Sequence, residues 1–394
     1  MSCYIAAYGL VSALGTGRDA SAEALLAWQR EGISPLDRHR TALLDGRLTP
    51  VGRVEGELPA IPAALAPYAS RNNQLLLAAL TQIRPALDQA LATHGPARVG
   101  LVLGTSTAGI GEAELAVAAA LHGEAVPPEF DYRQQELGSP SEFLARHLGL
   151  TGPAWTISTA CSSSARAFIS GQRLLAAGLA DAVLVGGADS LCGLTLNGFD
   201  SLESLSCARC QPFDETRQGI NIGEGAALFL LSRTPAPLAL LGAGESSDAW
   251  HISAPHPEGV GAEAAMRMAL AQAGLTPAQV GYVNLHGTAT RLNDAMESQA
   301  VHRLFGAEVP CSSTKPLTGH TLGAAGAIEA ALACLLLERA LPLPPQRVAT
   351  ADPALAPIWL VSGEVPLAAP RVLSNSFAFG GNNVSLLFGS VHHE

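Results

Sequence analysis

Residues 98–107 read Arg-Val-Gly-Leu-Val-Leu-Gly-Thr-Ser-Thr, and residues 279–290 read Gln-Val-Gly-Tyr-Val-Asn-Leu-His-Gly-Thr-Ala-Thr. Each stretch is an apolar run that ends in glycine and hydroxyl residues, which is typical of a buried strand followed by a loop. A strand, turn and helix around Cys161 correspond in the same way to a segment between Lys315 and Gly326. The repetition predicts two similar α/β halves whose loops meet at one central site.

Apolar strands alternate with Ala/Leu-rich helices outward from these stretches. We predict strands at residues 99–103, 182–186, 226–231 and 282–285, and helices at residues 73–91, 165–177, 262–273 and 324–339. The run Thr-Pro-Ala-Pro at 234–237 is the predicted boundary between the halves, which places them at residues 1–236 and 237–394.

The composition indicates an acidic protein with a large core. Of its 394 residues, 48% are apolar and 14% are charged, and the formal net charge is −11. Such a charge argues against nonspecific nucleic-acid binding, because phosphates would be repelled. The two longest stretches without Asp, Glu, Lys or Arg, 147–165 and 372–393, are rich in Gly, Ser, Thr or Asn, so we expect no membrane span.

The first residues and the cysteines indicate in which cellular compartment the protein is expected. The start has no basic region of a signal peptide and is typical of a strand. Seven scattered cysteines fit free thiols in a reducing cytoplasm better than a disulfide framework. Cys207 and Cys210 form a C-x-x-C, but no second ligand pair completes a zinc site, so we expect a cytoplasmic protein without a metal.

Cys161 follows a predicted strand at 154–158 and opens a predicted helix. A thiol on such a turn meets unpaired N–H groups at the positive end of the helix, and these favour the nucleophilic thiolate. The same N–H groups can hold a developing oxyanion. A small buried thiol between sheet and helix is an equally good interpretation of this segment alone.

Lys315 is the only lysine of the chain, and every other basic side chain, histidine aside, is arginine. A surface charge tolerates that exchange, whereas a site that needs a compact ammonium does not. Lys315 lies five residues before His320, and His286 ends another predicted strand. One cysteine and two imidazoles suit thioester chemistry, in which the thiolate accepts an acyl group and the imidazoles stabilise an enolate. A lone histidine at a strand end is more often structural.

Residues 374–383 read Ser-Asn-Ser-Phe-Ala-Phe-Gly-Gly-Asn-Asn. Paired glycines allow a sharp turn whose amides can point into a cavity. The alternative is a tight turn with two core phenylalanines.

Five motifs then follow one another in a set order and spacing. They are Thr159-Ala160-Cys161-Ser162-Ser163, His286-Gly287-Thr288, Lys315-Pro316-Leu317-Thr318-Gly319-His320, Gly323-Ala324-Ala325-Gly326 with Glu329, and Asn375-Ser376-Phe377-Ala378-Phe379-Gly380-Gly381. Over essentially the whole chain, they resemble the β-ketoacyl-acyl-carrier-protein synthases of the elongating Cys-His-His type. The resemblance implies a thiolase-like fold, with two βαβαβαββ halves in five layers, αβαβα, usually in a dimer.

The resemblance also implies a decarboxylative Claisen condensation in fatty-acid or polyketide chain elongation. Cys161 would take an acyl chain from acyl carrier protein, and the backbone amides of Cys161 and Phe379 would form the oxyanion hole. His286 and His320 would hold the thioester oxygen of malonyl carrier protein as CO2 leaves, and Phe379 would act as a gate. Lys315, paired with Glu329, would orient the site and set the field around His320.

Further positions are expected to contact the substrate. Thr288 and Thr290 match positions that contact the phosphopantetheine arm of the carrier protein, and we expect Thr107, Phe199 and Phe377 around the substrate. The resemblance implies no metal and no redox cofactor, since the carrier protein brings its own arm.

The chain departs from the family pattern at several points. Arg291 stands where a proline is usual, Gln218 where an aspartate follows arginine, and Asn382 where a threonine is common. Thr107-Ala108 stand near the acyl-pocket floor, where a bulky aliphatic is frequent, which suggests a different chain such as a polyene or an aromatic-primed polyketide. Arg71 and Arg209 are candidates for docking the carrier protein.

Three alternatives remain at this point. A chain-initiating synthase that uses acyl-CoA usually has Cys, His and Asn, which His320 argues against. A non-catalytic chain-length factor typically lacks the nucleophile, which Cys161 argues against. A homodimer and the active half of a heterodimer with such a factor both stay open.

Overall fold

The centre of the molecule is a twelve-stranded mixed sheet, seen in a computed structural model that describes residues 3–391. Strand β1 (Cys3–Ser12) joins two half-sheets. Its first residues pair with β9 (Leu238–Ser247), and most of its length pairs with β8 (Gly225–Ser232), both antiparallel.

The N-terminal half-sheet has the order β1-β8-β7-β5-β6. Strand β5 lies parallel to β6 and β7, whereas β8 is antiparallel to both neighbours. Along the chain its main elements are β1, α2 (Arg71–His94), β5 (Val99–Gly104), α4 (Ser139–Leu148), β6 (Ala154–Ile157), α5 (Ser163–Ala176), β7 (Ala182–Asp189) and β8. Smaller elements between them are β2 (Gly15–Thr16), α1 (Gly17–Glu31), β3 (Arg40–Ala42), β4 (Leu48–Pro50), α3 (Ile110–Leu121) and α6 (Gly193–Ser201).

The C-terminal half-sheet repeats this plan in the order β9-β14-β13-β10-β11. Its main elements are β9, α7 (Val260–Ala273), β10 (Tyr282–Asn284), α8 (Arg291–Phe305), β11 (Pro310–Ser312), α10 (Ala325–Arg339), β13 (Arg371–Phe377) and β14 (Asn382–Ser390). The short α9 (Lys315–Thr318) follows β11, and β12 (Trp359–Leu360) adds an edge strand. Both halves therefore follow the βαβαβαββ order that the resemblance implied.

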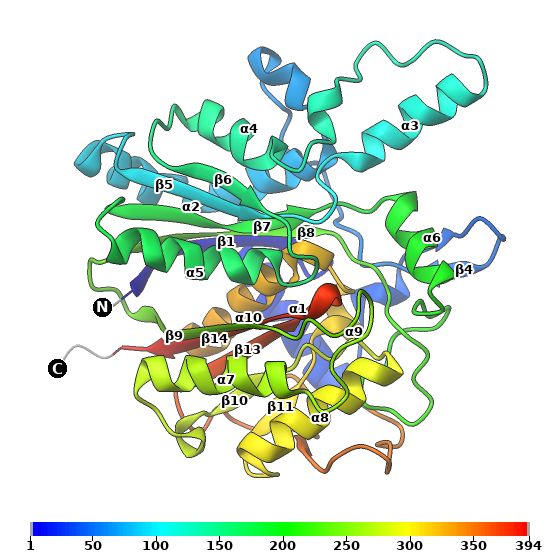
Figure 1. Cartoon of the computed structure of the whole chain (residues 1–394), viewed down its shortest axis with the longest axis vertical. Helices are drawn as coiled ribbons and strands as arrows, with labels where there is room; N and C mark the ends of the chain where they lie inside the picture. The colour runs from blue at the N-terminus through cyan, green and yellow to red at the C-terminus, as the bar shows by residue number, and fades with distance from the viewer. Residues whose placement is uncertain (1–2, 392–394) are drawn as a thin grey trace.

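The elements stack in five layers, as Figure 1 shows. Helices α2 and α4 cover the outer face of the N-terminal half-sheet, and α7 and α8 lie on the outer side of the C-terminal one. Helices α5 and α10 lie between the half-sheets. Every residue of α10 from Ala325 to Leu336 is buried, as a helix with sheets or helices on all sides requires. The αβαβα arrangement is confirmed.

The predicted elements are all present, with small shifts at their ends. Helix α2 begins at Arg71, two residues before the predicted start, because the Ser70 side chain accepts from the backbone N–H of Asn73 and caps it. Strand β10 ends at Asn284, one residue early. Strand β8 ends at Ser232 and β9 begins at Leu238, on either side of the predicted boundary.

Two glycines bring the middle helices close to each other and to the sheet. A Cβ on Gly104, at the end of β5, would lie 2.2 Å from the backbone nitrogen of Ser164 in α5. A Cβ on Gly326, in the first turn of α10, would lie 2.6 Å from the Ala165 Cβ. The two helix N-termini therefore meet where the parallel strands of both half-sheets end, which is the usual place for a ligand in α/β folds.

Candidate active site

Cys161 lies on a sharp turn between β6 and α5. The residue before it, Ala160, has a φ of +50°, a strained left-handed conformation for a residue with a Cβ. The turn is held by the Ser163 hydroxyl, which donates to the Ala160 carbonyl at 2.6 Å. Only 6% of Cys161 is exposed. The predicted strand-to-helix turn is therefore present, and it presents the thiol to the space between the halves.

The resting thiol of Cys161 is neutral. Burial raises the pKa of the Cys161 thiol to about 12, although the positive charge of Lys315 and the amides of Phe379 and Cys161 act to lower it. The amides do favour the thiolate, as the sequence predicts. The loss of water around the sulfur outweighs them, so a proton must leave before the sulfur can attack.

His286 and His320 approach the thiol from the C-terminal half. The Nε2 atom of His320 lies 2.9 Å from the Cys161 Sγ. The two imidazole rings meet edge to face, with centroids 5.4 Å apart. One donor atom from each of the three residues lies within 4.8 Å of the others. The structure thus brings together the three side chains that the sequence singles out.

Both imidazoles are neutral in this environment. Burial holds the pKa of His286 and of His320 well below the usual value, and the nearby charge of Lys315 lowers both further. The Nδ1 atom of His320 has no hydrogen-bond partner among residues 3–391. Its Nε2 atom lies beside the Cys161 sulfur and therefore faces the reacting atoms.

Lys315 is 1% exposed and lies at the start of α9. Its Nζ donates to Glu329 Oε1 at 2.6 Å and to the His286 carbonyl, and lies 3.5 Å from His286 Nδ1. An ammonium can only donate, so Nδ1 of His286 is the acceptor and its Nε2 carries the hydrogen toward the cavity. We expected Lys315 to act mainly around His320. Its hydrogen bonds go to His286, and it reaches His320 only through its field.

A second buried carboxylate, Glu297, holds the loop that carries His286. It is fully buried and accepts from the backbone N–H groups of His286 and Gly287, each at 2.7 Å. Burial raises the pKa of Glu297 to about 7. Asn375 and Asn293 donate to the same carboxylate at 3.4 Å. Sequence reasoning missed Glu297, because a glutamate inside a polar helical segment looks like a solvated residue.

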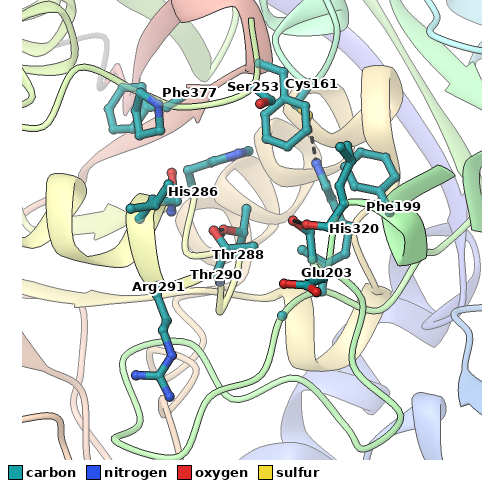
Figure 2. Close-up of a pocket in the computed structure, with 18 of the residues that line it drawn as sticks. Cys161, Phe199, Glu203, Ser253, His286, Thr288, Thr290, Arg291, His320 and Phe377 are labelled. Carbon is teal, nitrogen blue, oxygen red and sulfur yellow. Dashed lines mark hydrogen bonds between the residues drawn. The ribbon is translucent and has the colours of Figure 1, made fainter. Parts of the chain in front are cut away.

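The triad lies at one end of a cavity of about 290 Å³ (Figure 2). Five predicted residues line it with the triad: Phe199, Thr288, Thr290, Phe377 and Phe379. The rings of Phe199 and Phe379 lie 5.5 Å apart. Glu203, Arg217 and Arg291 also line it and were not predicted as site residues. Figure 2 places Cys161 at one end, Glu203 and Arg291 at the other, and Thr288 and Thr290 between them.

Three predicted contacts lie elsewhere. The Thr107 hydroxyl and amide both donate to Asp189 Oδ1, at 2.7 and 2.8 Å, and Thr107 does not line this cavity. The Arg71 guanidinium donates to the buried Glu224 through Nε at 2.7 Å and Nη2 at 2.5 Å. Arg209 pairs with Asp37 at 2.7 Å and lies over the Trp28 ring. Both guanidinium groups are occupied within the chain, which counts against them as docking residues.

The donor set of the triad would also suit a metal, because zinc is commonly bound by cysteine and histidine. The Lys315 ammonium beside His286 opposes a further cation at that point. The expectation that no metal is needed stays a prediction.

Within residues 3–391, every helix is too short or too polar to cross a bilayer. The seven cysteines are all free thiols, including Cys207 and Cys210.

Comparison with known proteins agrees with this geometry. The protein-family model of the beta-ketoacyl synthase N-terminal domain matches residues 4–236, and the family model of the C-terminal domain matches residues 239–348. The 3-oxoacyl-[acyl-carrier-protein] synthase 2 of Rhizobium meliloti is 38% identical over 263 residues. That match covers 60% of this chain and 61% of the Rhizobium protein, so it spans less than two thirds of its length.

Solved structures match over a longer range. A chain of the complex between the ketosynthase ApeO and its chain length factor ApeC from Xenorhabdus doucetiae is 54% identical to this chain. The TM-score is 0.95, with 99% of this chain and 98% of that one covered. The ishigamide ketosynthase/chain length factor is 26% identical with a TM-score of 0.86, and 99% of both chains is covered.

Proposed function

The chain belongs to the β-ketoacyl synthase family, and on that basis we propose that it condenses an acyl chain held on Cys161 with malonyl-acyl carrier protein. The products are CO2 and a 3-oxoacyl-acyl carrier protein. The observation that carries the proposal is the convergence of one thiol and two neutral imidazoles, from different halves of the fold, at the inner end of a cavity.

Acyl transfer to Cys161 is the first step. As the acyl thioester enters, the thiol proton passes to His320 Nε2, 2.9 Å away, and the sulfur attacks the carbonyl carbon. The backbone amides of Cys161 and Phe379 hold the oxyanion, since both already stabilise negative charge on the sulfur. The intermediate then expels the carrier thiol, which takes the proton from His320.

Condensation is the second step. The thioester oxygen of malonyl carrier protein accepts hydrogen bonds from Nε2–H of His286 and from Nε2–H of His320, whose hydrogen moves from Nδ1 to Nε2 after acyl transfer because Nε2 is the acceptor in the first step. The bond to the carboxylate breaks, CO2 leaves, and the electron pair passes into an enolate held by the two imidazoles. The enolate carbon attacks the acyl carbonyl on Cys161, and the sulfur leaves as a thiolate that recovers a proton from the solvent.

Other residues around the triad orient its imidazoles and line the path of the substrate. Lys315, paired with Glu329, fixes His286 with its N–H toward the cavity and keeps both imidazoles neutral. Phe379 and Phe199 lie against each other at the cavity wall, where Phe379 acts as the gate. Thr288, Thr290 and Phe377 line the path of the arm and its acyl group.

We propose acyl carrier protein as the substrate carrier and a chain-length-factor-like subunit as the second chain of a cytoplasmic heterodimer. The similarity to a chain of the complex between ApeO and its chain length factor ApeC supports the heterodimer over a homodimer. The same similarity favours polyketide-type elongation over general fatty-acid synthesis.

Intact-protein mass spectrometry tests the proposal. The purified chain, with and without a co-expressed partner, is incubated with a panel of acyl carrier proteins. Acyl-sized mass increases on the wild type, and none on Cys161→Ala, are expected. A wild type that acquires no acyl group from any donor, even with its partner, would refute the condensing activity.

A further inference from the structure

Arg291 stands apart from most arginines of the chain. Most guanidinium groups pair with carboxylates, and Arg217, the other arginine at the cavity, is 3% exposed and pairs with Asp352 at 2.6 Å. Arg291 is exposed and forms no ion pair or hydrogen bond through its side chain with any residue from 3 to 391. Its charge acts on Asp352, whose ion pair is with Arg217, so the N–H donors of Arg291 stay available to a group outside the chain.

The place of Arg291 in the cavity indicates what kind of group it could bind. Arg291 opens α8 and lines the cavity at the end opposite Cys161 (Figure 2). Glu203 lines the same end, on the other side of the opening in this view, and also lacks an ion pair among the described residues. The opening therefore has one positive and one negative side, in a chain whose net charge is −11.

We propose that Arg291 binds the phosphodiester of the phosphopantetheine arm and so selects carrier-bound thioesters over uncharged thioesters. The inference rests on the proposed function, because it takes a pantetheine-type thioester as the substrate. Such an arm carries its thioester at one end and a phosphodiester at the other. With the thioester carbonyl at Cys161, the arm runs along the cavity and its phosphate emerges where Arg291 lies.

The chemistry of the two groups fits. A guanidinium presents parallel N–H donors that match two phosphate oxygens, and the bonds are strengthened by charge on both partners. A phosphodiester is strongly hydrated, so the exposed end of the cavity is the place where it can bind without losing all of its water. Glu203 repels the same phosphate, which directs it toward the Arg291 side.

The test compares two small donors, hexanoyl-pantetheine and hexanoyl-4′-phosphopantetheine, in the acylation of Cys161 followed by intact mass. We expect the wild type to react about fivefold faster with the phosphorylated donor, as an exposed ion pair allows. Arg291→Met should reduce that ratio to about one, and Glu203→Gln should increase it. Arg30→Met is the matched control, because Arg30 is also exposed, forms no ion pair within residues 3–391 and lies outside the cavity.

Several results would overturn the inference. One is a wild type that reacts equally with both donors, and another is an unchanged ratio in Arg291→Met. If Arg291→Met slows only the reaction with intact acyl carrier protein while the ratio of small donors stays the same, the charge serves acidic side chains of the carrier and the inference is wrong.

A second measurement separates this inference from the proposed function. Millimolar S-methyl-4′-phosphopantetheine and S-methyl-pantetheine, which carry neither an acyl group nor a thiol that would consume the reagent, are compared as protectants of Cys161 against iodoacetamide at pH 9. If no thioester acylates the protein but the phosphorylated compound still protects better, and Arg291→Met removes the difference, the condensing activity fails and phosphate binding stands. Equal protection by both compounds would overturn the inference whatever the acylation shows.

Discussion

In the N-terminal half, the loop after β6 brings one side chain, Cys161, and its own amide to the cavity. In the C-terminal half, the loops after β10 and β11 bring His286, Lys315 and His320, behind which Glu329 and Glu297 are buried. The chain path is the same in both halves, yet one supplies a nucleophile on a strained turn and the other supplies a supported set of polar side chains.

The difference shows how one fold can divide a reaction. In the proposed reaction, the first half would hold the acyl group on the Cys161 sulfur beside its own amide, and the second half adds the Phe379 amide and His320. The second half must keep two imidazoles neutral and fixed inside a dry site, and that takes an ammonium and two carboxylates. Acylation should therefore need Cys161 of the first half together with His320 of the second, whereas decarboxylation should depend on the second half alone.

The largest expected effect is that of Cys161→Ala, which should lower condensation by roughly 10⁴-fold or more, because the acyl group has no site of attachment. Release of CO2 from malonyl carrier protein should persist within about tenfold, since both imidazoles remain. Radiolabelled CO2 release and product formation measure the two activities, with Cys207→Ala as a control outside the cavity. Loss of both activities in Cys161→Ala would contradict the assignment of decarboxylation to the C-terminal half alone.

The two histidines should differ from each other. His286→Ala and His320→Ala should each lower CO2 release by about 10²- to 10³-fold, the usual cost of one oxyanion donor. Self-acylation should be almost unchanged in His286→Ala and slowed in His320→Ala, because only His320 lies within hydrogen-bonding distance of the sulfur. Single-turnover acylation of the two variants, measured side by side, decides the point. Equal acylation rates in the two variants would show that His320 takes no part in acyl transfer to Cys161.

Lys315→Arg should lower condensation by roughly tenfold to a hundredfold although the charge is kept. The site is fully enclosed, and a guanidinium cannot take the place of the compact Nζ between Glu329 and the His286 carbonyl without displacing them. Steady-state kinetics, together with circular dichroism to verify folding, test this. Full activity would mean that only the charge matters and not the shape of the ammonium.

The smallest expected effect is a change in pH dependence. In the wild type the His286 and His320 pKa values lie well below the usual range, so both stay neutral, and active, well into the acidic range. Lys315→Met combined with Glu329→Gln removes the charge that lowers these pKa values without leaving a buried carboxylate unpaired. The acidic limb of the CO2-release profile should then move up by about one pH unit. An unmoved limb would show that burial alone keeps the imidazoles neutral.

Much of the fold and the reacting residues could be predicted from the sequence. The repeated strand-and-loop pattern at 98–107 and 279–290 identified both halves, and the motifs around Cys161, His286 and Lys315 proved to meet in space. These features depend on local pattern and on a resemblance, which a sequence carries directly.

What could not be predicted depends on three-dimensional surroundings. The protonation state of Cys161 is the balance of burial against two amides and a charge, and only the folded site gives that balance. The Lys315 hydrogen bonds to His286, 29 positions away, and the pairing of Arg71 with Glu224, 153 positions away, join residues from distant segments. The sequence suggests Thr107 as a pocket residue, but its hydroxyl donates a hydrogen bond to Asp189.

The burial of the only lysine has a practical consequence for the bench. Lys315 is 1% exposed, so amine-directed reagents such as succinimidyl esters and aldehydes find no lysine side chain on the surface. Lysine-based cross-linking through this chain would fail to capture the proposed carrier protein or the proposed second subunit, however tight the complex. Acidic side chains, which number 34 among Asp and Glu, offer better attachment points, and carboxyl-directed coupling is the reagent class to choose for trapping its assemblies.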